Sequence, residues 1–216
     1  MVNKELYFSL MKTRQEDFKN ISGAPLEIIM NQSVILEYER KNNKQIGCVY
    51  ESPYHFLLVD LVIDTRTEKM FTYERILNFI SGGSVIIPFF KGKFVLLKQF
   101  RHALRDYQIC FPRGFCEVNN TPEQNASKEL TEELGVDSSS FKLKYLGDVV
   151  ADSGLCGNKV SIYLAVLEDE PKVLQTEGIT NIITLDESEL KDNITNGKIN
   201  DGFSLSAFAL YQQNRQ

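Results

Sequence analysis

The chain has 216 residues, of which 43% are hydrophobic and 25% are charged. This balance is typical of an ordinary globular protein and argues against a disordered chain, a collagen-like repeat or a disulfide-rich miniprotein. The net charge of -5 provides no global positive field, so nucleic acid is not expected as a main partner. No apolar run approaches the ~20 residues of a membrane span, and the N-terminus lacks a signal-peptide pattern. We therefore expect no membrane role and a cytoplasmic location.

Cysteine and histidine usage argues against a structural zinc site. The four cysteines are scattered without a C-x-x-C spacing, and the chain has two histidines. Small buried hydrophobic side chains, rather than ligands or nucleophiles, are expected at Cys48, Cys110, Cys116 and Cys156. The sequence also lacks the G-x-S-x-G, Walker and G-x-G-x-x-G patterns, which removes the commonest hydrolase and nucleotide-binding signatures.

The first 82 residues are predicted to form a helix and a β-rich region. Residues 1 to about 25 place apolar side chains near one helical face before Gly23 and Pro25 break the pattern. This segment is interpreted as a helix and a turn, serving as an arm or as a helix that binds a partner. Five β-rich stretches are expected at 26–30, 33–40, 47–52, 55–64 and 69–77.

The second half alternates predicted strands and helices. Two apolar runs at 84–90 and 93–100, joined by Lys91 and Gly92, predict a buried hairpin. Further along we expect an irregular stretch at 101–110, a helix at 122–134, a strand pair at 141–150 and 160–167, and a C-terminal helix at 205–211.

The predicted helix from Pro122 to Leu134 has well-defined ends. Thr121 and Gln124 have the spacing of a capping box, and Gly135 supplies the left-handed residue that ends a helix. An apolar stripe and an adjacent acidic stripe run along this helix. The apolar residues are Ala126, Leu130 and Leu134, and the acidic residues are Glu129, Glu132 and Glu133.

The acidic stripe conflicts with the local rules of helix stability. Glu129 and Glu133 repel each other across one turn by roughly 0.2–0.5 kcal/mol, and the C-terminal end of the helix dipole disfavours anions. This conflict indicates a missing counter-charge, and three carboxylates within one turn suit a hard divalent cation such as Mg²⁺. The alternative is a solvated acidic helix face, since Glu is a common surface residue of helices.

The segment from Gly114 to Val136 resembles the Nudix box, G-x5-E-x7-R-E-U-x-E-E-x-G-U, in which U is aliphatic. Seven of nine positions match, namely Gly114, Glu129, Leu130, Glu132, Glu133, Gly135 and Val136. Asn120 and Lys128 replace the Glu and Arg that form a supporting ion pair in the family. The paired change leaves no stranded charge, so the fold is expected to tolerate it, whereas catalysis could be slowed.

Shorter matches extend the resemblance over about residues 85 to 211. FVLLKQFRHALRDYQICFPRGF is similar to the strand, Q-Y-R element and E-x-P-x-G approach of the ADP-ribose pyrophosphatase branch. DSGLCGNKVSIYLA and the C-terminal part resemble later segments of that branch. The resemblance implies an α+β fold, with an α/β/α sandwich around a mixed sheet at 83–216. Residues 1–82 would add a β-rich extension that could serve as a dimerisation arm.

The same resemblance implies a reaction and a ligand set. The reaction is Mg²⁺-dependent hydrolysis of the diphosphate of ADP-ribose or a related nucleoside diphosphate sugar, with Mn²⁺ as an alternative ion. Glu129 and Glu133 would be the principal metal ligands, and Glu132 a further ligand that also serves catalysis. The backbone carbonyl of Arg113 would complete the set, and Glu117 would be a helper.

A catalytic base and substrate contacts are also implied. The family branch takes its base from a later loop, here residues 168–177, and Glu177 is favoured over Glu168, Asp169 and Glu170. Arg101 matches a position that contacts substrate in the family, since a guanidinium can grip phosphate or stack on adenine. Arg105 and Arg113 are second candidates for phosphate contacts, with solvated surface arginines as the alternative.

Two other functional interpretations stay open. Asn120, Lys128 and the long first half suit a non-catalytic Nudix-like sensor that binds nucleotides without hydrolysing them. A purely structural role would make the acidic helix an ordinary surface. The expected partners are a small-molecule nucleoside diphosphate substrate and a second copy of the chain in a homodimer, without nucleic acid or membrane.

Overall fold

The computed structural model of the protein describes residues 2–80, 82–174 and 177–214. The chain divides into two compact units. Unit 1 comprises Met1–Phe79 and Asp152–Gly157, and unit 2 comprises Ile80–Ala151 and Asn158–Gln216. The sequence predicts the boundary between residues 82 and 83, a few residues further along, and does not anticipate that a later segment belongs to unit 1.

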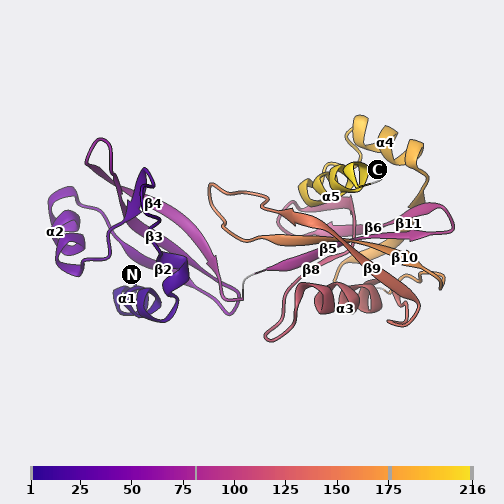
Figure 1. Cartoon of the computed structure of the whole chain (residues 1–216), viewed down its shortest axis with the longest axis horizontal. Helices are drawn as coiled ribbons and strands as arrows, with labels where there is room; N and C mark the ends of the chain where they lie inside the picture. Colours follow the sequence, from indigo (N-terminus) through magenta and orange to yellow (C-terminus); the bar gives the residue numbers. More distant parts are fainter. Residues whose placement is uncertain (1, 81, 175–176, 215–216) are drawn as a thin grey trace. The chain divides into compact units, whose positions relative to one another are not determined.

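Unit 1 is an antiparallel sheet packed with helices (Figure 1). Strand β3 pairs with β4 along its whole length, so β1 and β2 share the other edge of β3. The strands are β1 (Leu26–Ile28), β2 (Gly47–Glu51), β3 (His55–Asp64) and β4 (Lys69–Asn78). The helices are α1 (Lys4–Thr13), the 3-10 helix η1 (Gln15–Phe18) and α2 (Gln32–Asn42).

The predicted N-terminal helix is present as α1, and its apolar face lies in the core of unit 1. Tyr7 and Leu10 of α1 are buried with Phe18 of η1 and with Phe56 and Leu58 of β3. Burial of apolar area of this kind is the main source of folding stability. The expected role of this segment as an arm or partner-binding helix stays a prediction.

The buried Asp60 of β3 has partners on both β4 and helix α1. Asp60 is 1% exposed, and its Oδ1 accepts a hydrogen bond of 2.7 Å from the hydroxyl of Tyr7. Its Oδ2 accepts a 2.5 Å hydrogen bond from Nε of Arg75, whose guanidinium lies 4.7 Å from the centre of the Phe18 ring. The carboxylate is therefore paired and hydrogen-bonded, as a buried charge requires.

The stretch at 33–40 forms a helix, so its interpretation as a strand is wrong. Asn31 caps α2 by accepting hydrogen bonds from the backbone of Ser33 and Val34, and Asn43 ends it in the left-handed conformation. A run of three apolar residues fits a strand and a buried helix turn equally well. Within the helix, Glu39 is buried and accepts a 2.8 Å hydrogen bond from the backbone N–H of Ile46.

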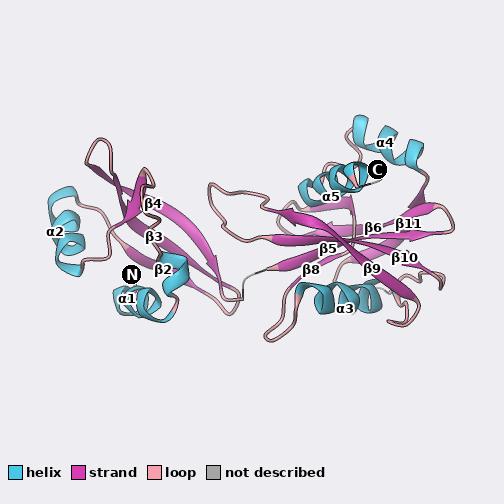
Figure 2. Cartoon of the chain, in the orientation of Figure 1, coloured by secondary structure: helices cyan, strands magenta, loops and turns pink. Residues whose placement is uncertain are grey.

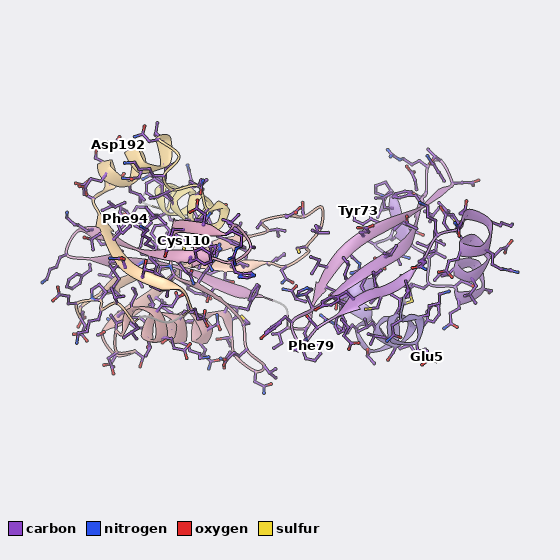
Figure 3. All side chains as sticks on the ribbon, turned by 180° about the vertical axis from the view of Figure 1, so that it is seen from behind. Glu5, Tyr73, Phe79, Phe94, Cys110 and Asp192 are labelled. Carbon is purple, nitrogen blue, oxygen red and sulfur yellow. The ribbon has the colours of Figure 1, made fainter. Side chains whose placement is uncertain are left out.

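The segment Asp152–Gly157 joins unit 1 by pairing with β4. The backbone N–H of Ile76 donates to the carbonyl of Leu155 at 2.8 Å, and a parallel bridge links Ile76 to Cys156. The hydroxyl of Tyr73, which is labelled on β4 in Figure 3, donates to the carbonyl of Gly154 at 2.8 Å. A loop of the second half thus covers part of the free edge of this sheet, where unpaired backbone groups would otherwise face solvent.

Unit 2 is built on a mixed sheet, in which the part of the chain that is described contributes seven strands (Figure 2). Their order is β11, β6, β5, β10 and β9, with β7 beside β6 and β8 beside β5. Strands β5 and β10 run parallel, and the other pairs are antiparallel. The bounds are β5 (Gly83–Phe90), β6 (Lys93–Arg101), β7 (Asp106–Cys110), β8 (Arg113–Phe115), β9 (Phe141–Val149), β10 (Val160–Leu167) and β11 (Ile179–Leu185).

The predicted hairpin is confirmed, whereas the irregular stretch is partly wrong. Lys91 and Gly92 both have positive φ, at 49° and 80°, as a two-residue hairpin turn of the primed type requires. Residues 106–110 form strand β7, which pairs with β6 from Arg101 opposite Asp106 to Leu97 opposite Cys110. This short polar strand is stabilised by its pairing with the buried strand β6, and the local sequence does not indicate that pairing.

Helices cover both faces of the sheet of unit 2 (Figure 1). Helix α3 (Pro122–Leu134) packs on one face with Ile86 and Val95, and helices α4 (Glu187–Thr195) and α5 (Gly202–Gln213) pack on the other with Val85 and Phe94. Alternate residues of β5 and β6 therefore point to opposite cores, as the strand period requires. The α+β fold with an α/β/α sandwich around a mixed sheet is confirmed, and the predicted C-terminal helix lies within α5.

All four cysteines are free thiols, and Cys48, Cys110 and Cys116 are buried while Cys156 is half-buried. They pack as small apolar residues, as the sequence predicts. Within the described ranges, no helix combines the length and the apolar character needed to traverse a lipid bilayer.

Candidate functional site

Helix α3 has the ends that its sequence predicts. The side chain of Thr121 accepts a hydrogen bond from the backbone of Gln124, whose side chain accepts one from the backbone of Thr121. Pro122 occupies the first turn, and Gly135 ends the helix with φ of 61°. These caps satisfy backbone groups that would otherwise lack partners. They define where the helix begins and ends, and therefore which of its residues face the sheet.

The two predicted stripes of α3 face different surroundings. The apolar residues Ala126, Leu130 and Leu134 are fully buried against the sheet. Of the acidic residues, Glu133 is buried with 5% of its surface exposed, Glu129 is partly buried and Glu132 is exposed. The acidic stripe is therefore not a uniformly solvated surface, because two of its carboxylates point into the protein.

Glu133 is an abnormal carboxyl group. Burial, together with the charge of Glu129, raises the pKa of Glu133 to about 8. Two groups act in the opposite direction: the backbone N–H of Arg113, which donates to Oε2 of Glu133 at 3.2 Å, and the charge of Arg101. A carboxyl group with this pKa is mostly protonated at neutral pH, and a cation beside it would favour its charged form.

Glu129 shares this property. Burial and the charges of Glu132 and Glu177 raise the pKa of Glu129 to about 7. Its carboxylate lies against Gly114, where an added β-carbon would stand 1.8 Å from Oε1. Glycine is therefore required at 114 because the carboxylate occupies the space of a side chain.

Asn125 joins α3 to the two strands beside it. This side chain is fully buried, and its Nδ2 donates to Oγ of Ser84 at 2.8 Å and to the carbonyl of Gly114 at 3.2 Å. Ser84 lies on β5 and pairs with Gly114 of β8 in the sheet register. The contact between Gly114 and α3 is thus held by a second, independent set of bonds.

Lys128 has a carboxylate partner that the sequence does not predict. Its ammonium group forms an ion pair with Glu117 and a longer one of 3.5 Å with Glu132. Nδ2 of Asn120 donates to the other oxygen of Glu117 at 3.4 Å. The ion pair that the sequence appeared to have lost is present in a shifted form, with the carboxylate three residues earlier in the chain.

Arg101, at the end of β6, has an incompletely paired guanidinium. Its Nη2 donates to the sulfur of Cys110 at 3.5 Å, and its Nε is buried without a hydrogen-bond partner in the described part of the chain. Because its charge lowers the pKa of Glu133, this guanidinium lies within electrostatic reach of that carboxylate. A buried N–H without a partner is costly unless a ligand supplies one.

Glu177 lies close enough to the carboxylates of α3 to affect both. Its charge contributes to raising the pKa of Glu129 and of Glu133. Glu177 is exposed and has φ of 50°, and its carbonyl accepts a 2.9 Å hydrogen bond from Nε2 of the buried Gln99. The next residue, Gly178, accepts from the backbone of Phe100 at 2.9 Å, so the loop is anchored to β6.

The competing acidic residues lie elsewhere. Glu168, Asp169 and Glu170 follow the end of β10, which pairs with the far end of β5 near Phe89. Gly114 pairs with the opposite end of β5, at Ser84. Residues 175 and 176 of the predicted base region lie outside the described residues.

The two other predicted arginines have partners within the protein. Arg105 is exposed on the turn between β6 and β7, where its Nη1 lies 3.0 Å from Nδ1 of His102 and its guanidinium lies 5.4 Å from the centre of the Phe100 ring. Nη1 of Arg113 donates to Oδ1 of Asp201 at 2.8 Å. The structure thus places Arg101, rather than Arg105, within electrostatic reach of Glu133.

Comparison with known proteins assigns the chain to a family. Residues 81–201, more than half of the chain, match the NUDIX domain. The protein belongs to the Nudix family. A crystal structure of an ADP compounds hydrolase has the same fold, with a TM-score of 0.63 and 16% sequence identity. The match covers 78% of this chain and 90% of that chain. Among curated protein sequences, no significant match was found.

The donor set of this Nudix site fits a hard divalent cation. No three His, Cys, Asp or Glu side chains within the described ranges are grouped closely enough to hold a metal ion by themselves. Mg²⁺ does not require such a group, because it is usually bound by one or two carboxylates and keeps positions for water and substrate phosphate. The buried Glu133 and the partly buried Glu129 both have raised pKa values, and a cation would convert their carboxyl groups to the charged form.

Sequence reasoning missed three residues that shape this Nudix site. The sequence predicts Glu117 as a helper but not as the partner of Lys128, and it predicts no role for Asn125 or Asp201. Local signals existed for the first and the last. Glu117 is the nearest acidic residue before Asn120, and Asp201 precedes a helix with Ser204 at the capping distance. Nothing local indicates that Asn125 is buried.

Proposed function

We propose that this protein is a Mg²⁺-dependent Nudix pyrophosphohydrolase that acts on ADP-ribose or a related nucleoside diphosphate sugar. The observation that carries the proposal is the pair of inward-facing carboxylates on α3, Glu129 and Glu133, whose pKa values are raised to about 7 and about 8. Burial of two neighbouring acids is unfavourable by itself, and a bound cation removes the penalty. The proposal therefore explains why an unfavourable arrangement is built on a well-capped helix.

The proposed metal ligands are Glu129, Glu133 and the backbone carbonyl of Arg113, with Glu132 as a further ligand. Bound Mg²⁺ would neutralise the diphosphate and lower the pKa of a bound water. Glu132 has an ion pair of 3.5 Å with Lys128, so its role as a ligand requires that it exchange that partner. Mn²⁺ is the expected substitute ion, since it also accepts oxygen ligands.

Arg101 is the proposed phosphate contact. Its buried Nε, which has no hydrogen-bond partner among the described residues, and its weak bond to the Cys110 sulfur leave donors for a phosphate oxygen. Arg105 lies on the exposed turn between β6 and β7, so its role as a phosphate contact stays a prediction with less support. Glu177 is the proposed base, which takes the proton of the attacking water as the new phosphorus–oxygen bond forms. The bond between that phosphorus and the bridging oxygen then breaks, giving a nucleoside monophosphate and a sugar phosphate.

The ADP-ribose class of substrate rests on two supports. The sequence from 94 to 115 resembles the approach to the site in the ADP-ribose pyrophosphatase branch. The protein with the same fold is named an ADP compounds hydrolase. Both supports concern the adenosine diphosphate part, so we propose an ADP-containing substrate and treat the sugar as open to test.

The test compares three proteins with ADP-ribose and Mg²⁺. The parent is expected to release AMP and ribose 5-phosphate, and Glu133→Gln is expected to lower kcat/KM by about a hundredfold or more. Glu123→Gln, on an exposed position of the same helix, is the matched control and should keep parent activity. Equal turnover of all three proteins would contradict the proposal.

A ligand-binding readout separates the enzyme from the sensor. If the parent gives no product from ADP-ribose or other ADP sugars but is stabilised against heat by them, the protein is a non-catalytic nucleotide-binding module. This alternative was suggested by the loss of the box Glu and Arg, and the ion pair between Lys128 and Glu117 weakens that reason.

The homodimer is proposed on the resemblance alone. In the related branch, copies pair through N-terminal strands and each site draws on both chains. Gel filtration with light scattering is expected to give twice the mass of 24.7 kDa. A monomer would contradict the proposal without affecting the metal site.

A further inference from the structure

The side chain of Arg113 points away from the carboxylates that its backbone contacts. Nη1 of Arg113 donates to Oδ1 of Asp201 at 2.8 Å, and its guanidinium lies 5.0 Å from the centre of the Phe203 ring. Asp201 and Phe203 lie at the start of α5, on the face of the sheet opposite α3. Arg113 therefore links a segment beside one helix to the first turn of another.

Asp201 has a partner for each of its oxygens. Oδ1 accepts from Arg113, and Oδ2 accepts from the backbone N–H of Ser204 at 2.9 Å and from its hydroxyl at 2.8 Å. The residue is 5% exposed and caps α5. A carboxylate is favoured at this position both by the helix N-terminus and by the guanidinium.

Ser204 continues the connection to the same segment. Its Oγ accepts a 2.9 Å hydrogen bond from the backbone N–H of Phe111. The first turn of α5 thus holds the chain at two points, the backbone of Phe111 and the side chain of Arg113. Pro112 lies between them, and its carbonyl accepts a 2.9 Å hydrogen bond from the backbone of Ile86.

The held segment is the one that faces the acidic helix. The backbone N–H of Arg113 donates to Glu133 at 3.2 Å, and Gly114 contacts Glu129. A shift of this segment would change its contacts with Glu133 and with Glu129, because Arg113 and Gly114 are adjacent in the chain. It would also move the carbonyl of Arg113, which is the proposed metal ligand. Metal sites depend on such supporting bonds for the geometry of their ligands.

We propose that Asp201 is a positioning residue for the metal site, acting through Arg113 and Ser204. In this proposal the guanidinium of Arg113 binds Asp201 and does not contact the phosphate of the substrate, which revises its expected role. The inference rests on the proposed function, since it assumes that Mg²⁺ binds at Glu129 and Glu133. It adds a residue from α5, outside the box that the family shares.

The decisive variant is Asp201→Asn. Asn remains a good helix cap and has nearly the same shape, so the variant removes the charge that holds Arg113 while keeping α5. Asp192→Asn is the matched control, since Asp192 is exposed on α4 at the outside of the unit (Figure 3). Arg113→Gln removes the other partner, and Ser204→Ala, which removes the bond to Phe111, remains informative if the first variant does not fold.

Two measurements are made on each protein. The first is the Mg²⁺ concentration that gives half of the maximal thermal stabilisation without substrate, and the second is kcat and KM for ADP-ribose. Asp201→Asn and Arg113→Gln are each expected to raise the Mg²⁺ midpoint by about 10- to 100-fold and to lower kcat, while KM at saturating Mg²⁺ changes little. The double variant should be no worse than either single variant, because both remove one interaction.

The outcomes separate this inference from the proposed function. If Mg²⁺ does not stabilise the parent, or stabilises Glu133→Gln equally, the metal site is wrong and the inference fails with it. If the parent responds and Asp201→Asn has the same Mg²⁺ midpoint, the positioning role alone is overturned. A rise in KM for Arg113→Gln with an unchanged midpoint would overturn it too, by showing that the guanidinium binds substrate.

Discussion

A β-carbon on Gly114 would stand 1.8 Å from Oε1 of Glu129. Real β-carbons do not approach other heavy atoms so closely, so the first glycine of the box exists to admit the carboxylate of the helix. The relationship couples two positions that are far apart in the chain but adjacent in space. Because α3 is capped at both ends, the position of Glu129 along the helix is fixed, and its carboxylate lies against Gly114.

The substitution Gly114→Ala is expected to displace the Glu129 carboxylate and to lower turnover by about a hundredfold. The thermal stabilisation by Mg²⁺ should weaken in the same variant, because the metal ligand moves. Gly157→Ala is the control, since a β-carbon there meets nothing within 4 Å. If Gly114→Ala keeps the kcat and the Mg²⁺ response of the parent, the contact between Gly114 and Glu129 is not needed for activity.

The stability of the metal-free protein is expected to fall as the pH rises from about 5 to about 9. Burial raises the pKa of Glu133 to about 8 and that of Glu129 to about 7, so the folded state binds protons more tightly than the unfolded chain. The stabilisation from these protons is complete at low pH and is lost as the pH passes the folded pKa values. Thermal melting in EDTA across this range measures the slope.

Two comparisons test the origin of that slope. Glu133→Gln should flatten it, because the amide carries no titrating proton, and Glu123→Gln should not. Saturating Mg²⁺ should reverse the trend, since cation binding requires the charged carboxylates. Identical slopes for the parent and Glu133→Gln would mean that other groups dominate.

The ion pair between Lys128 and Glu117 is expected to affect turnover more than the thermal stability of the protein. Glu117 is exposed and Lys128 is partly exposed, so Glu117→Gln and Lys128→Met should each shift Tm by only about 2 °C or less. Turnover should fall by about tenfold in each, and the double variant should match the single variants.

Rebuilding the pair of the family pattern provides the complementary test. The combination of Asn120→Glu with Lys128→Arg restores the box residues, and it should keep or raise the activity of the parent. Full activity in Glu117→Gln and in Lys128→Met would show that this Nudix site works without any such pair.

The buried Asp60 of unit 1 predicts a large effect on stability. Arg75→Met removes its ion-pair partner and should cost about 3–5 kcal/mol, whereas Tyr7→Phe removes one hydrogen bond and should cost about 1–2 kcal/mol. Circular dichroism during urea unfolding measures both. Arg66→Met is the control, because that arginine is exposed and its carboxylate partner is also accessible. Equal effects of Arg75→Met and Arg66→Met would contradict the prediction.

The sequence predicts α3 and its stripes well because their determinants are local. The capping box, Gly135 and the spacing of Leu130 and Leu134 all lie within one helix, and the structure confirms each of them. Helix α2 also has local signals, the Asn31 cap and Asn43 in the left-handed conformation, but its run of three apolar residues fits a strand equally well.

The site shows the same division. Glu129 and Glu133 could be predicted from spacing and family resemblance, but their burial and their partners could not. Arg113 meets Asp201 across 88 residues, and Gln99 meets Glu177 across 78. Such pairs depend on the register of the sheet and the helix that crosses it, which no local pattern encodes. The shifted partner of Lys128 depends on a loop conformation for the same reason.

The pairing of residues 152–157 with β4 bears on how this protein can be dissected. Unit 1 is completed by a loop that the chain supplies only after it has passed through the acidic helix and β9. Removal of the first 79 residues would leave Leu155 and Cys156 without the strand that holds them, and expression of those residues alone would leave Ile76 without its partner. The N-terminal unit therefore depends on a later segment of the chain, and a genetic fusion or truncation at the boundary would separate residues 152–157 from the strand that they complete.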